Sequence, residues 1–156
     1  MKTNRWMPVL LATAFLVLPG CGAKKEASPE PAELYAAIEK QADLPDELTD
    51  LTQELLEDFT GISPEEYESA VYYLAEAGLA PDEIAIVKAK DTDSADHIQI
   101  LLQKRLDDKQ KAAENYLTEF MPILKAGVVR RDGLTVSLLV TANMENVLSA
   151  CSSLVD

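Results

Sequence analysis

The sequence DEIAIVKAKD at residues 82–91 decides the fold, because it predicts a strand that leads directly into a helix. Residues 84–90 form the strand, and Asp91 bounds it. Asp91 and Asp93 are good N-caps for a long helix that we expect to run to about residue 113. The buried face of that helix is marked by apolar residues at helical spacing, namely Ala95, Ile98, Leu101, Leu102 and Leu106.

Upstream of this strand, residues 70–74 read AVYYL and are rich in β-forming side chains. They predict a second strand within residues 67–76, preceded by one helical turn at residues 63–66. A helix over residues 67–76 is the alternative interpretation. Helical segments are also expected over residues 33–42, 46–59 and 144–155, and residues 116–124 form a further helical piece or a turn that ends near Pro122.

Downstream of the long helix, the sequence VVRRDGLTVSL at residues 128–138 predicts a β-hairpin. Asp132-Gly133 has the composition of a two-residue type I′ turn. With that turn, Val129 lies opposite Val136 on an apolar face, and the other face of the hairpin is more polar.

From residue 67 onward the expected order is strand, strand, helix, strand, strand, helix. This order predicts an α+β fold in which two β-β-α units form one four-stranded antiparallel sheet with helices on one face. Two acidic N-terminal helices precede the sheet. Residues 32–156 are long enough for this single domain.

Residues 1–20 predict a cleavable signal peptide, because a short positive region precedes an apolar run of about 10 residues. A helix that spans a bilayer needs about 20. The run ends in LPGC at residues 18–21, which resembles the lipobox of bacterial lipoproteins. This resemblance implies lipid on Cys21 and a location on the outer face of the cytoplasmic membrane. The small, polar and proline residues that follow predict a tether over residues 21–31.

The charge of the chain argues against nucleic-acid binding. The sequence has 27 acidic and 14 basic residues, a formal net charge of −13, whereas nucleic-acid binding depends on neutralising phosphates with Lys and Arg. The acidic excess lies between residues 26 and 83. We interpret it mainly as solvated helix faces, with an interaction surface for cations or basic partners as the alternative.

Few residues carry chemistry that could support catalysis. If Cys21 is lipidated, Cys151 is the remaining thiol, and its place on an apolar helical stripe indicates a core residue. His97 is the single histidine, so a metal site of the His/Cys type is not expected. The sequence contains no phosphate loop or nucleophile elbow. We therefore expect no cofactor, no metal and no enzymatic activity.

One basic patch is a candidate ligand site. Lys88 and Lys90 alternate with small apolar residues and leave the same strand face. Arg130 lies on the polar face of the predicted hairpin. If these faces coincide, the sheet presents cations that could bind an anionic ligand. The favoured alternative is that acidic residues of the N-terminal half cover them.

The segment at residues 82–91, followed by a charged helix and a late hairpin, resembles a known family. It is similar to the lipoproteins of Gram-positive, clostridial-type anaerobes in domain-of-unknown-function family 4358. The resemblance covers roughly residues 34–156 and implies an extracytoplasmic lipoprotein and a broad fold, but no activity. Its Glu-Ile-Ala-x-x-Lys core is matched by Glu83, Ile84, Ala85 and Lys88.

The sequence thus predicts a membrane-tethered, non-enzymatic domain that binds a small molecule or a protein. An enzyme or enzyme accessory that acts on cell-envelope material is the second hypothesis, and a structural spacer is the third. A pocket that gathers several titratable residues would favour the enzyme, whereas a basic or apolar patch would favour binding.

Overall fold

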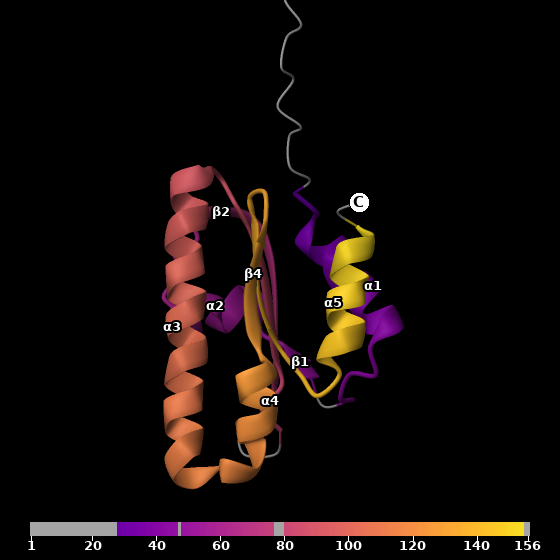
Figure 1. Ribbon diagram of the computed structural model, residues 1–156. Helices are drawn as coiled ribbons and strands as arrows, with labels where there is room; N and C mark the ends of the chain where they lie inside the picture. The colour runs from indigo at the N-terminus through magenta and orange to yellow at the C-terminus, as the bar shows by residue number, and fades with distance from the viewer. Residues whose placement is uncertain (1–27, 47, 77–79, 155–156) are drawn as a thin grey trace, which may run out of the picture.

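The computed structural model describes residues 28–46, 48–76 and 80–154 (Figure 1). The predicted signal peptide and Cys21 lie outside the described residues. Ten helices and strands and one 3-10 turn follow one another within this part of the chain: α1 (Pro31–Gln41), β1 (Leu48–Asp50), α2 (Thr52–Thr60), β2 (Tyr67–Ala75), β3 (Glu83–Ala89), α3 (Thr92–Tyr116), the 3-10 turn (Thr118–Phe120), α4 (Met121–Ala126), β4 (Val128–Asp132), β5 (Thr135–Val140) and α5 (Met144–Ser153).

The five strands form one antiparallel sheet in the order β1-β2-β3-β5-β4. The predicted strand at residues 84–90 is confirmed as β3, which lies at the centre between β2 and β5. The segment at residues 67–76 is a strand, β2, and not a helix. The sheet therefore has one strand more than the four that the sequence predicted.

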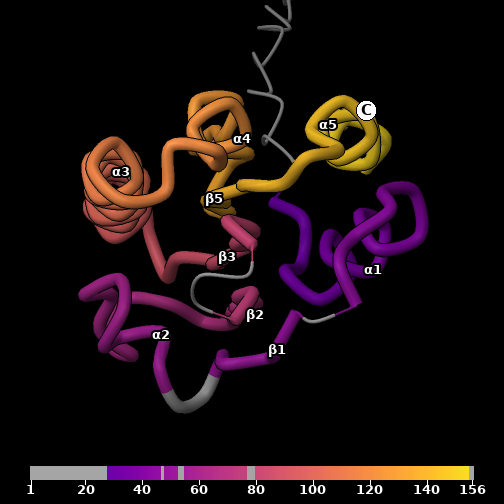
Figure 2. The backbone as a smooth tube through the Cα atoms, turned by 90° about the horizontal axis from the view of Figure 1, so that it is seen from below, coloured from indigo at the N-terminus to yellow at the C-terminus, as the bar shows by residue number. Residues whose placement is uncertain are grey.

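Helices cover both faces of the sheet, so the prediction that they pack on one face is wrong. Figure 2 shows α2, α3 and α4 on one side and α1 and α5 on the other. The residues of β3 alternate between two separate cores. Ala85 and Val87 pack toward α3, whereas Ile84 and Ile86 pack toward α1 and α5. The sequence of a strand that is buried on both faces is a continuous run of apolar residues, as at residues 84–87.

The extra strand, β1, replaces the start of a predicted helix. We expected a helix over residues 46–59, but β1 pairs with the end of β2, and α2 begins only at Thr52. Asp50 contributes to this change because its carboxylate accepts hydrogen bonds from the backbone N–H of Thr52 (3.0 Å) and from its hydroxyl (2.6 Å). These contacts satisfy a free donor at the helix start.

The long helix is confirmed, and two shorter predictions need correction. The Asp91 carboxylate accepts a hydrogen bond from the backbone N–H of Ser94 (2.8 Å) and so caps α3 as predicted. Residues 63–66 form a turn instead of a helical turn. Pro122 lies in the first turn of α4 instead of ending a helix, which suits a residue that lacks a backbone N–H.

The hairpin forms at the predicted place but with a different turn. Asp132 pairs with Thr135, so the two-residue loop is Gly133-Leu134, and Val129 lies opposite Leu138 instead of Val136. Gly133, the first loop residue, has φ of 61°, whereas Leu134 does not have positive φ, since among the described residues only glycines do. Positive φ at the first loop position alone is the pattern of a type II′ turn. Asp132 stays in the strand because it forms an ion pair with Arg130 (2.5 Å).

The first described residues contact the tip of this hairpin. The backbone N–H of Leu134 donates to the Ser28 hydroxyl (2.9 Å), and the Thr135 hydroxyl donates to the Pro29 carbonyl (2.7 Å). The hairpin tip lies beside the end of β3, since the N–H of Ala89 donates to the Leu134 carbonyl (2.9 Å). The chain therefore enters the fold at the end of the sheet where α3 begins, and α4 lies at the other end (Figure 1).

The second core predicts a mutational effect that a one-sided sheet would not show. We expect Ile86→Ala to lower the free energy of unfolding by about 2–5 kcal/mol, because Ile86 is fully buried between the sheet and α1 and α5. The matched control is Ile100→Ala on the exposed face of α3, which should stay within about 0.5 kcal/mol. Urea denaturation of both variants measures this, and equal values would contradict the three-layer arrangement.

Candidate functional site

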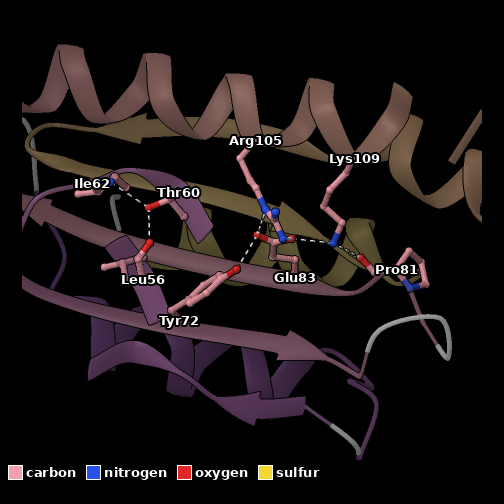
Figure 3. A network of polar contacts seen from close by, with 8 residues as sticks. All are labelled: Leu56, Thr60, Ile62, Tyr72, Pro81, Glu83, Arg105 and Lys109. Atoms are coloured by element: carbon pink, nitrogen blue, oxygen red, sulfur yellow. Dashed lines mark hydrogen bonds and ion pairs between the residues drawn. The ribbon is translucent and has the colours of Figure 1, made fainter. Parts of the chain in front are cut away.

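The most heavily bonded polar group in the described part of the chain is the carboxylate of Glu83. It is fully buried at the start of β3. Arg105 donates from Nε to Oε1 (2.9 Å) and from Nη2 to Oε2 (3.2 Å). Lys109 donates from Nζ to Oε2 (2.6 Å), and the Tyr72 hydroxyl donates to Oε1 (3.1 Å). Figure 3 shows these side chains converging on Glu83, which lies on β3, from β2 and α3.

Local structure explains why these side chains meet. Glu83 lies on the same face of β3 as Ala85, the face that α3 covers. Tyr72 lies opposite Ala85 on β2, so its ring points to this face as well. Arg105 and Lys109 are four residues apart on α3 and therefore neighbours on one side of the helix.

The charges of this cluster stabilise one another. Burial raises the pKa of the Glu83 carboxyl, but the charge of Lys109 and the hydrogen bonds of Arg105 outweigh it and hold the pKa below 4.5. Burial also lowers the pKa of Lys109, and the attraction of Glu83 does not fully cancel this. Ion pairing thus outweighs burial for Glu83 but not for Lys109. The reason is that Glu83 has two cationic partners, whereas Lys109 shares one carboxylate with Arg105.

A pocket of about 220 Å³ opens beside this cluster. It lies at the end of the sheet opposite to the hairpin tip, between the C-terminal half of α3, α4 and the end of β2. The lining is mostly apolar, with Arg105 and Lys109 as its charged residues: Phe59, Leu74, Ala75, Ala80, Pro81, Arg105, Lys109, Ala112, Ala113, Leu117, Phe120 and Leu124.

The two cations are fixed in place at the wall of the pocket. The Lys109 ammonium also donates to the Pro81 carbonyl (2.9 Å). The Arg105 guanidinium carbon lies 5.2 Å from the centre of the Phe59 ring, a cation–π contact. Both side chains keep some exposure, 21% for Arg105 and 17% for Lys109. A ligand in the pocket would therefore meet pre-positioned N–H donors.

The structure places the residues of the predicted basic patch in internal contacts. Lys88 pairs with Glu30 and lies 3.6 Å from Glu68. Lys90 donates to the backbone carbonyl of Glu65 (2.6 Å). The strand register puts Lys88 and Arg130 on one face of the sheet, as required for a shared patch.

Arg130 is occupied by its own neighbour, since it donates two hydrogen bonds to Asp132 (2.5 and 2.8 Å). All three basic residues thus have protein partners, but only Lys88 pairs with acidic side chains of the N-terminal half, as the internal-pairing alternative expects. Ligand binding by Lys88, Lys90 and Arg130 stays a prediction.

The other residues singled out in the sequence lie away from the pocket lining. Cys151 is buried in α5, and burial raises the pKa of its thiol. His97 lies 2.5 Å from a Glu66 carboxylate oxygen. Within residues 28–154, leaving out the gaps, no cluster of His, Cys, Asp and Glu has the arrangement of a metal site. None of the helices in the described ranges combines the length and the apolarity needed to cross a membrane.

Sequence reasoning missed both the cluster and the pocket, although one signal was present. The buried stripe of α3 contains Leu102, Leu106 and Ala113. Arg105 and Lys109 fall between these residues at helical spacing, so two cations lie at the edge of an apolar face. A cation in that position either extends its charged group to water or pairs with a buried acidic residue, and here both pair with Glu83.

Comparison with known proteins identifies one family. A family model described as "Domain of unknown function (DUF4358)" matches residues 40–141. This range contains the whole sheet, α3 and the pocket lining, and it leaves out α5 and most of α1. No curated protein and no solved structure matches the chain.

The buried cluster predicts how stability depends on pH. The pKa of Glu83 is lowered in the folded chain, so the ionised carboxylate stabilises the fold. This stabilisation is complete above pH 4.5 and is lost as the pH falls through the lowered pKa of the folded state. We expect Glu83→Gln to lower the free energy of unfolding by about 3 kcal/mol at neutral pH, because it leaves two half-buried cations without a charged partner.

The same substitution should flatten the fall in stability below pH 4.5. Denaturation curves at several pH values measure both effects. Glu68→Gln is the matched control, since Glu68 is half exposed and at 3.6 Å from Lys88. An unchanged acid dependence in Glu83→Gln would contradict the lowered pKa.

Proposed function

This chain belongs to the DUF4358 family, a domain of unknown function, and we propose from its own geometry that it is a non-enzymatic binding domain for a small ligand. The pocket beside Glu83 is the proposed binding site. Lipid on Cys21 anchors the domain to the outer face of the cytoplasmic membrane, as in a Gram-positive lipoprotein. The lipobox-like sequence and the short apolar leader support this anchor.

The single observation that carries the proposal is the pocket itself. Its volume of about 220 Å³ and its apolar lining suit a small molecule, and a few fixed polar groups at one wall supply orientation. Arg105 and Lys109 are both tied to Glu83. Fixed cations are suited to holding a ligand in one pose, which favours binding over proton transfer.

The position of the pocket relative to the N-terminal segment also supports binding outside the membrane. Ser28 and Pro29 contact the hairpin tip, at the end of the sheet where α3 begins. Lys109 is 18 residues beyond the Asp91 cap. At 1.5 Å per residue this separates the two ends by about 27 Å. A domain anchored through its N-terminus would thus present the pocket on the side away from the lipid.

We expect a thermal-shift screen of the full chain against cell-wall fragments, peptides and small anions to give ligands that Ala112→Phe abolishes. Ala112 is exposed and lines the pocket, so a phenyl ring there should fill the opening without disturbing the core. A ligand at about 100 times its Kd adds roughly 2.7 kcal/mol, which raises Tm by a few degrees.

The matched control is Glu114→Phe, an exposed position on the same helix that does not line the pocket. It should keep every ligand. Ligands that survive Ala112→Phe bind at another surface, and this result would refute the pocket as the binding site.

The anchor has its own test. We expect Cys21→Ser to abolish incorporation of labelled fatty acid and to release the protein from the membrane fraction, because two acyl chains at about 0.8 kcal/mol per methylene provide stable anchoring. Cys151→Ala should keep label and location, since Cys151 is buried in α5. Mass spectrometry of the mature N-terminus identifies the lipid, and label that persists in Cys21→Ser would disprove this site.

A further inference from the structure

We propose that the pocket takes a singly charged organic anion, with a carboxylate or similar head at Arg105 and Lys109 and a compact apolar body among Leu74, Leu117 and Phe120. This inference rests on the proposed binding function and names the class of ligand. The lining suits both parts of such a ligand. Two cations at one wall match the anionic head, and the apolar side chains that form most of the rest match the body.

The unused hydrogen-bond donors of the two cations define the head group. A Lys ammonium has three donors, and the structure uses two of those of Lys109, for Glu83 and for Pro81. A guanidinium has five donors, and two of those of Arg105 go to Glu83. Arg105 Nη1 has no hydrogen-bond partner among the described residues. These free donors belong to half-buried cations, and a charged donor forms its strongest hydrogen bonds with an anionic acceptor.

The charge count of the cluster points the same way. Glu83 carries one negative charge against the two positive charges of Arg105 and Lys109. Asp82 is also buried nearby and acts on Lys109 electrostatically, though less than Glu83 does. In the described part of the chain, the Asp82 carboxylate forms no ion pair with either cation. In direct contacts the two cations thus share one carboxylate, so a ligand carboxylate would add a second, whereas a cationic ligand would be repelled by both cations.

The size and lining of the pocket define the body of the ligand. An apolar cavity of about 150 Å³ holds benzene, so the 220 Å³ of this pocket accommodate a body of one ring or a short branched chain. Phe59 lies against the Arg105 guanidinium, and Phe120 also lines the pocket. An aromatic or aliphatic monocarboxylate therefore matches the site in both charge and volume.

Three matched probes test this inference on the purified full chain by calorimetry. Phenylacetate, phenethyl alcohol and phenethylamine share the same ring and nearly the same length, and they differ in charge. We expect phenylacetate to bind at least tenfold more tightly than the alcohol, and the amine to bind most weakly. Ala112→Phe should abolish the binding of phenylacetate.

Lys109→Met adds a test of the head group, because Met keeps the length of the side chain and removes its charge. It should reduce the preference for phenylacetate over phenethyl alcohol at least tenfold, and Lys111→Met, an exposed position on α3, should leave the preference unchanged. If Lys109→Met does not fold, the three probes on the unmodified chain decide alone.

The outcomes separate this inference from the proposed function. Equal or tighter binding of the alcohol or the amine would overturn the anionic class and leave the pocket as a binding site for another ligand. Binding of none of the three at millimolar concentration would also overturn the inference, and the screen with Ala112→Phe would then decide whether the pocket binds any small molecule.

Discussion

The burial of the Glu83 carboxylate is the constraint on which the arrangement of this domain depends. A charged group without solvent requires partners within hydrogen-bond distance. Those partners come from β2, through Tyr72, and from α3, through Arg105 and Lys109. The pairing fixes both the rotation of α3 about its axis and its position along the sheet. The same two cations then form the wall of the pocket, so one set of ion pairs both orders the fold and builds the candidate site.

The two sides of the sheet have separate roles. The side under α1 and α5 contains the larger β3 residues, Ile84 and Ile86, and packs as a closed core. The side under α3 has small residues on the same strand, Ala85 and Ala89, beneath the longer side chains of the helix. Toward the end of β2 this second core opens into the pocket. The closed side provides stability, and the other side has the space and the charges that a ligand requires.

The sequence predicted those features that depend on near neighbours. The passage from β3 into α3 is one, because Asp91 and the apolar stripe lie within a few turns of each other. The hairpin was found, but its turn was placed one residue early, since the ion pair between Arg130 and Asp132 depends on strand geometry. The pocket was out of reach, because its lining runs from Phe59 to Leu124 and forms only when distant elements meet. For the same reason β1, which is three residues long, was read as helix.

The contact of Glu30 with Lys88 shortens the tether that would connect an anchored domain to the membrane. With Ser28 to Glu30 held against the sheet, the chain between Cys21 and the first held residue has six residues, from Gly22 to Ala27. The seven residue steps from Cys21 to Ser28 span at most about 25 Å. An anchored domain could then explore only a thin layer above the bilayer. Its pocket would stay at a nearly constant height above the bilayer. This raises the effective concentration of the pocket for any ligand that is confined to the same layer.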